Sequence, residues 1–228
     1  PEDHFGGLHE TAILPEERCV PGIWWTADLQ TYPDPYVSAV RARPRVAVED
    51  GRVDSAAVDV TADVVTNEAI DDRLTLSFRP EGNARGGGAM DRTRVDTEPG
   101  ATTVQYTIDV RDPALWWPHD RGAQSRYTVR AKLDGATASV TTGLRSVAYD
   151  DELRVNGERL PARGVTLLDP TPEDVRRATA ANANLVRVRA QGVPPSVADA
   201  CDEHGVLLWA DLPLSGPGEF DADRGREL

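Results

Sequence analysis

The chain has 228 residues, enough for one large domain or two small ones, and its apolar content of 39% is adequate for a folded core. A formal net charge of −13 argues against a nucleic-acid partner, because that function needs a basic surface. No apolar run approaches the roughly 18 residues that a membrane span needs, so we expect no membrane partner.

The charged residues are biased in type as well as in sign. Lys132 is the only lysine, and every other basic residue apart from histidine is arginine. A surface rich in Asp and Glu but poor in Lys stays soluble at high salt, where screening removes self-repulsion. We interpret this as a halophilic signature, which slightly favours a soluble cytoplasmic protein of a high-salt organism. An ordinary acidic protein from a high-GC genome is the alternative, and the sequence leaves secretion open.

Residues 1–35 are dense in Gly, Pro and aromatic residues and contain one strand-like stretch, 11–14. The segment is too short and irregular to form its own core, so we expect the end of a domain whose start is missing. His4 and His9 with Glu10 have no third ligand at zinc-like spacing, and we predict no metal site. Cys19 and Cys201 form no CxxC motif, and a disulfide between them is left open.

From Tyr36 to Tyr149, apolar and polar residues alternate with a period of two, as in half-buried strands. The apolar positions predicted to face the core are Val58, Val60, Ala62 and Val64; Leu74, Leu76 and Phe78; Val104, Tyr106, Ile108 and Val110; and Tyr127, Val129, Ala131 and Leu133. Asp-Gly pairs at 50–51 and 134–135 suit turns between strands. About seven short strands without a helix predict an antiparallel, immunoglobulin-like sandwich. The glycine-rich stretch 81–91 is expected to be a flexible hairpin tip.

After residue 150 the pattern becomes mixed. Asn156-Gly157 suits the turn of a hairpin, and Thr171 suits the N-cap of a helix whose first residue is Pro172. A strand at 185–190, a second helix ending at Gly205 and an apolar strand at 206–212 follow. The second helix has one inward face, made by Val197, Ala200, Cys201 and His204. The order strand–helix–strand–helix–strand predicts a parallel sheet.

A sandwich followed directly by strand–helix units is an uncommon pairing, and here the sequence resembles family 2 glycoside hydrolases, most closely their β-mannosidase-like members. Four stretches carry the resemblance in the family's order: FGGLHETAIL (5–14), PALWWPHDRGAQSRYTV (113–129), LRVNGERLPARGVTL (153–167) and NLVRVRAQGVPPSVADACDEHGVLLWADLP (184–213). They are similar, in turn, to the end of the sugar-binding jelly roll, a late stretch of the sandwich, the start of the barrel, and barrel strands two and three.

The resemblance implies a multidomain β plus α/β protein with three parts. Residues 1–35 would be the C-terminal tail of a jelly-roll domain, 36–149 the immunoglobulin-like sandwich, and 150–228 the truncated start of a TIM (β/α)₈ barrel. It also implies a retaining glycosidase that acts on β-glycosides without a cofactor. The family's two catalytic glutamates lie near the ends of barrel strands four and seven. We therefore expect a chain that holds neither, is inactive alone, and has as partners a carbohydrate and the missing N- and C-terminal parts of the same protein.

Four residues are candidates for binding substrate or supporting the site. Arg187 matches the family's strand-two arginine, which stands beside the nucleophilic glutamate and keeps it ionised; the alternative is a structural ion pair. Asp211 matches the aspartate of the family's Trp-x-Asp and either contacts a sugar or site residue or caps the next loop. Arg189 and Gln191 depart from the β-mannosidase pattern Arg-x-Trp-Gly-Gly-Gly and can make different polar contacts with a sugar. This departure keeps open a non-catalytic carbohydrate-binding or structural relative.

The aromatic and histidine residues of these motifs are expected to have structural roles. Trp209 lies in an apolar run and is predicted to be core. Trp116 and Trp117 are predicted to pack between sandwich and barrel or at a strand end. His204 is predicted to be buried packing, and His119 to lie in a turn.

Overall fold

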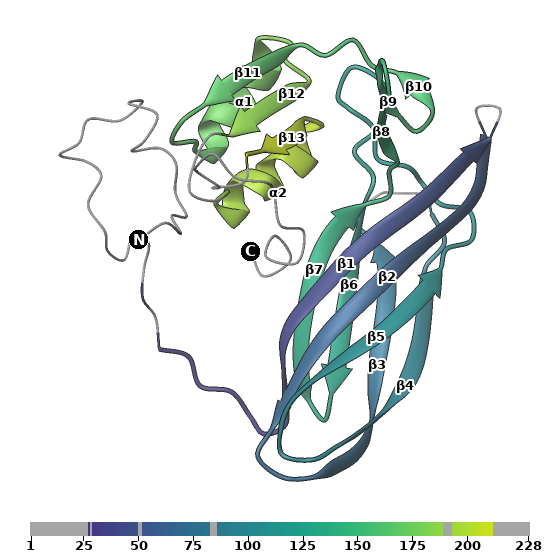
Figure 1. The fold of residues 1–228 in the computed structure, drawn as a ribbon, viewed down its shortest axis with the longest axis vertical. Helices are drawn as coiled ribbons and strands as arrows, with labels where there is room; N and C mark the ends of the chain where they lie inside the picture. The colour runs from purple at the N-terminus through teal and green to yellow at the C-terminus, as the bar shows by residue number, and fades with distance from the viewer. Residues whose placement is uncertain (1–26, 28, 50–51, 83–85, 189–192, 212–228) are drawn as a thin grey trace, which may run out of the picture.

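The computed structural model describes residues 27, 29–49, 52–82, 86–188 and 193–211. The chain forms an elongated pair of β-sheets with a small α/β unit and a short hairpin sheet at one end (Figure 1). Several predictions lie outside the described residues: the strand at 11–14, the His4–Glu10 segment and Cys19. Cys201 is a buried free thiol, and its burial raises the pKa to about 12.

Seven strands form the elongated unit, which we call the sandwich. They are β1 (Tyr36–Glu49), β2 (Arg52–Thr66), β3 (Ile70–Pro80), β4 (Ala89–Thr97), β5 (Gly100–Asp109), β6 (Arg126–Leu133) and β7 (Ala136–Gly143). One sheet has the order β1-β2-β5 and the other β4-β3-β6-β7, and every neighbouring pair is antiparallel. The predicted seven-stranded antiparallel sandwich is confirmed.

The core of the sandwich follows the alternation in the sequence. Val58, Val60, Ala62 and Val64 of β2 are each at most 1% exposed, and they meet the inward residues of β3 and β6 in one cluster. Because side chains of a strand alternate between faces, the intervening polar residues lie outside. On that outer face, Asp59 and Asp63 each pair with an arginine of β1 and a threonine hydroxyl of β5.

The glycine-rich stretch before β4 differs from the sequence prediction. A Cβ added at Gly86 would lie 2.0 Å from the Tyr127 hydroxyl oxygen, and one at Gly87 would lie 2.1 Å from the Arg111 carbonyl oxygen. The Gly87 amide also donates to the Asp112 carbonyl at 3.2 Å. In residues 86–88, glycine therefore permits close backbone packing, and the prediction of a flexible tip is wrong for this part.

Beyond the sandwich, a short antiparallel sheet contains β8 (Val147–Tyr149), β9 (Leu153–Val155) and β10 (Glu158–Arg159). Its turn has positive φ at Asn156 (50°) and Gly157 (80°). A two-residue hairpin turn that matches the right-handed twist of its strands requires positive φ at both positions. The Asn156 side chain donates to the Trp116 carbonyl at 3.0 Å and accepts from the Ser146 amide at 2.9 Å. The hairpin is thus tied to the end of the sandwich.

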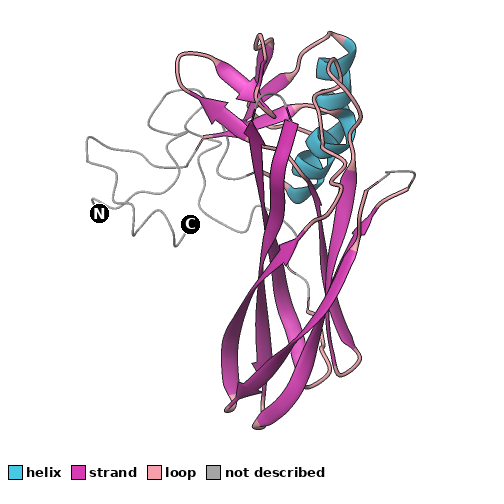
Figure 2. Ribbon diagram, turned by 90° about the vertical axis from the view of Figure 1, so that its right-hand side faces the viewer, coloured by secondary structure: helices cyan, strands magenta, loops and turns pink. Residues whose placement is uncertain are grey.

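The α/β unit contains β11 (Gly164–Leu167), α1 (Pro172–Ala180), β12 (Leu185–Val188), α2 (Pro195–His204) and β13 (Leu207–Ala210). Its strands are parallel in the order β11-β12-β13, which confirms the predicted parallel sheet. The two helices pack side by side on one face of that sheet (Figure 2). Among the described residues, no helix is long and apolar enough to cross a bilayer.

Both helix ends predicted from the sequence are confirmed. Thr171 is the N-cap of α1 and forms a capping box, since its amide donates to the Asp174 carboxylate at 3.0 Å and its hydroxyl accepts from the Asp174 amide. Gly205 ends α2 in the left-handed conformation, with φ 70°. His204, predicted as buried packing, is only half-buried.

The parallel sheet has open edges, from which we predict a difference in stability. Within the described residues no strand pairs with the outer edge of β11 or β13, and Val165, Leu168 and Trp209 are 37–57% exposed. In limited proteolysis of this chain, we expect thermolysin to cleave within residues 150–228 well before it cleaves the sandwich. Mass spectrometry of the fragments measures this, and equal resistance of the two parts would contradict it.

Candidate functional site

The register of the parallel sheet sorts its side chains into two faces. Val186 and Val188 face the helices and are at most 1% exposed. The cross-strand neighbours Thr166, Arg187 and Trp209 form a row on the opposite face, near the C-terminal ends of the strands. We call these three residues the Arg187 row.

The face that carries the Arg187 row is closed at one end and open at the other. Leu185 precedes Arg187 by two residues, and Leu207 precedes Trp209 by two. These two leucines pack in a cluster with fully buried Trp116. The Arg187 row extends past this cover, and Trp209 is 57% exposed. The prediction that Trp209 belongs to the core is therefore wrong: only the N-terminal half of this face is covered by the described residues.

Arg187 and Asp211 meet at the open end. Nε of Arg187 donates to Oδ1 of Asp211 at 2.9 Å and Nη2 donates to Oδ2 at 2.8 Å, a bidentate ion pair. Asp211 directly follows β13, and its amide continues the ladder by donating to the Val188 carbonyl at 3.1 Å. The Arg187 guanidinium carbon lies 5.6 Å from the Trp209 ring centroid. The site is therefore a charged pair beside an exposed indole.

The electrostatics of the pair fix one protonation state. The hydrogen bond to Asp211 raises the pKa of Arg187 above its ordinary value, so the guanidinium stays protonated at any working pH. Such a group can bind and orient oxygen ligands, but it cannot serve as a general acid or base. An exposed indole beside hydrogen-bonding groups suits a ligand with one apolar face and polar edges.

The four site residues predicted from the sequence fall into two groups. The structure brings Arg187 and Asp211 together, whereas Arg189 and Gln191 lie outside the described residues. Sequence reasoning missed Thr166 and the exposure of Trp209. The available signal was the alternation of side chains along the strand, which places Trp209 on the same face as Leu207, two residues earlier.

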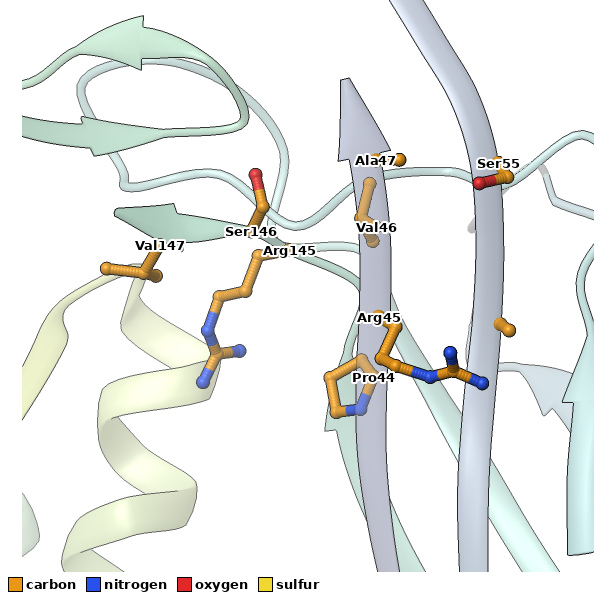
Figure 3. Close-up of a pocket in the computed structure, with 9 residues that line it drawn as sticks. Pro44, Arg45, Val46, Ala47, Ser55, Arg145, Ser146 and Val147 are labelled. Atoms are coloured by element: carbon orange, nitrogen blue, oxygen red, sulfur yellow. The ribbon is translucent and has the colours of Figure 1, made fainter. Parts of the chain in front are cut away.

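A cavity of about 430 Å³ lies elsewhere, between β1, β2 and residues 145–147 (Figure 3). No residue of the parallel sheet lines it. Arg145, on its wall, is bound to α2 by an ion pair with Asp202 at 3.0 Å, and its guanidinium carbon lies 4.5 Å from the Trp116 ring centroid. Because this cation is already engaged, we do not place the functional site there. Among the described residues, no group of three or more His, Cys, Asp or Glu side chains could hold a metal ion.

Comparison with known proteins gives consistent results for sequence and fold. Residues 36–145 match the model of the family described as glycosyl hydrolases family 2. Beta-mannosidase B of Thermothelomyces thermophilus is 30% identical over 207 residues, covering 77% of this chain and 23% of the mannosidase. Beta-mannosidase A of Aspergillus clavatus is 28% identical over 152 residues, covering 50% of this chain and 16% of that protein.

Solved structures extend the likeness to the fold. The beta-D-mannosidase of Dictyoglomus thermophilum superposes with a TM-score of 0.60 at 19% identity, covering 79% of this chain and 25% of that one. The likeness fits an immunoglobulin-like β domain. The chain thus spans between 16% and 25% of the length of these three proteins.

Proposed function

This chain belongs to glycosyl hydrolase family 2, and from that premise we propose that it forms part of the active-site frame of a retaining β-glycosidase. The reaction is hydrolysis of the O-glycosidic bond of a β-glycoside by double displacement, without a cofactor. The observation that carries the proposal is the Arg187–Asp211 pair at the open C-terminal end of the parallel sheet, in a chain whose sandwich matches the family model. The names of the relatives make a β-mannoside the first substrate to test.

The proposal assigns three parts to the chain. Residues 36–149 are the sandwich domain, 150–228 begin a (β/α)₈ barrel, and 1–35 are the tail of a jelly-roll domain. Two features support the barrel. Helices cover one face of the parallel sheet, and the described residues close the other face only at its N-terminal end. Barrel enzymes build their active sites at the C-terminal ends of the strands, where Arg187 and Asp211 lie.

Arg187 and Asp211 have supporting roles in this proposal. A retaining enzyme needs two carboxyl groups about 5–5.5 Å apart, one as acid/base and one as nucleophile. We place both glutamates outside these 228 residues. Arg187 keeps the nucleophile ionised, because the pair with Asp211 uses only Nε and Nη2 and leaves the Nη1 donors for a second carboxylate. Asp211 fixes the plane of the guanidinium and contacts a sugar hydroxyl. Arg189 and Gln191 add polar contacts to the same sugar.

A second function is a non-catalytic carbohydrate-binding relative. The sequence at Arg189 and Ala190 favours it, since β-mannosidases carry tryptophan and glycine there. Both functions place a carbohydrate beside Trp209 and Arg187. They differ only in whether the complete protein cleaves the sugar.

One assay separates the two functions. The complete protein, in molar salt, is expected to release nitrophenol from at least one member of a panel of nitrophenyl β-glycosides. The 228-residue chain is expected to release none, because it lacks the carboxylate pair. Sugar binding by the complete protein without turnover would select the second function. Turnover by the chain alone would show that its catalytic groups have been misplaced.

A further inference from the structure

The loop between β5 and β6 (residues 110–125) meets the α/β unit at the end opposite the Arg187 row. From this loop, the Trp116 indole nitrogen donates to the Asp202 carbonyl of α2 at 2.7 Å. His119 contacts both turns that lead into strands: its amide donates to the Gly205 carbonyl at 2.9 Å, and its Nε2 lies 2.9 Å from the Ala183 carbonyl oxygen. The loop thus reaches the segments that precede β12 and β13.

These contacts satisfy backbone groups that a helix cannot satisfy itself. The last four carbonyls of an α-helix have no intrahelical partner, and Asp202 is two residues from the end of α2. Trp116 supplies the missing donor from another part of the chain. Arg145, which follows β7, places a guanidinium 3.0 Å from the Asp202 carboxylate at the same helix end, where a cation is favoured by the helix dipole.

Trp116 is also the centre of the closed end of the sheet. Its side chain is fully buried with Val155 and Leu160, against Leu185 and Leu207. The fit is tight, since a Cβ added at Gly143 would lie 2.6 Å from the Trp116 Cβ. Leu185 and Leu207 precede Arg187 and Trp209 by two residues on the same face, a rise of roughly 6.6 Å along a strand.

We propose that Trp116 is a positioning residue, through which the sandwich fixes where the Arg187 row stands. It holds the C-terminus of α2 by one hydrogen bond and the Leu185–Leu207 layer by packing. Because close-packed interiors have few voids and transmit strain, a displacement at Trp116 is passed on through Leu207 to Trp209 and Arg187. The biological meaning of this coupling rests on the proposed function, but the coupling itself does not.

Fluorine NMR of the 228-residue chain, labelled with 5-fluorotryptophan, tests the coupling without any catalytic readout. The Trp209 resonance is assigned as the one lost in Trp209→Phe. Trp116→Phe keeps an aromatic ring but removes the N–H donor and part of the packing. We expect the Trp209 resonance to shift by more than its linewidth in this variant.

The control is Val64→Ala, a fully buried change in the sandwich core where β2 pairs with the start of β1. It is expected to lower stability while leaving the Trp209 resonance in place. If Trp116→Phe fails to fold, Arg145→Gln takes its place, with a smaller shift expected because it removes the ion pair with Asp202 and the cation over the Trp116 ring but leaves the Trp116 side chain in place. A Trp209 resonance that stays in place in Trp116→Phe, or one that moves equally in Val64→Ala, would overturn the proposal and leave the proposed function untouched. Absence of glycosidase activity from the complete protein would refute the proposed catalytic function and leave the coupling untouched.

Discussion

Replacing Arg187 by methionine in the complete protein is expected to lower kcat/KM for its β-glycoside by about 10²- to 10³-fold, the usual effect of losing one fixed donor at a developing charge. Methionine keeps much of the stem but removes the charge and the fork of donors that pairs with Asp211. Arg187→Lys is expected to lose less, because the charge remains while the bidentate geometry is lost. Steady-state kinetics of the unsubstituted protein and the two variants, on the nitrophenyl β-glycoside that the complete protein hydrolyses, give the three values of kcat/KM.

The pH dependence of kcat/KM separates the proposed role of Arg187 from a merely structural one. If Arg187 keeps a nucleophilic carboxylate ionised, its removal raises the pKa of that carboxyl. The acid limb of the kcat/KM profile then moves to higher pH. The matched control is Arg176→Met on α1, because Arg176 also forms a bidentate pair, with Glu173, but lies on the surface. It is expected to leave rate and profile unchanged. An unchanged acid limb in Arg187→Met would assign Arg187 to structure alone.

Local patterns in the sequence were sufficient to predict much of the fold. Alternation of apolar residues from Val58 to Val64 identifies a strand and its buried face, because side-chain direction has a period of two. The capping box at Thr171 and the left-handed Gly205 depend on a few neighbouring residues, so they too could be predicted. The parallel sheet followed from the order of strands and helices.

Properties that depend on distant segments could not be predicted in the same way. Trp209 lies in an apolar run, but its exposure depends on where the cover from Trp116 and Leu160 stops. The close packing at Gly87 depends on the Arg111 carbonyl, which the sequence pattern does not place. The Arg187–Asp211 contact needs the register between β12 and β13. The roles proposed for these two side chains come from the family resemblance and await the kinetic test.

A buried asparagine connects the start of β12 to the segment that enters β11. Asn184 is fully buried; its side-chain oxygen accepts from the Arg163 amide at 2.8 Å, and its nitrogen donates to the Pro161 carbonyl at 3.1 Å. The same nitrogen lies 3.4 Å from the Asp120 carboxylate of the sandwich loop. One side chain therefore links the segments that precede β11 and β12 and connects them to the sandwich loop.

Asn184→Leu is expected to destabilise the α/β unit by about 2–4 kcal/mol. Leucine fills a similar volume but removes the two part-buried hydrogen bonds from the side chain of Asn184 to the Arg163 amide and the Pro161 carbonyl, and each lost bond costs about 1–2 kcal/mol. Hydrogen exchange of residues 153–211 in the complete protein measures the loss as faster exchange there, with the sandwich unchanged. Asn182→Gly is the control, because Asn182 is exposed with φ 65°, which glycine adopts freely. Equal exchange in both variants would mean that the hydrogen bonds of Asn184 do not stabilise the α/β unit.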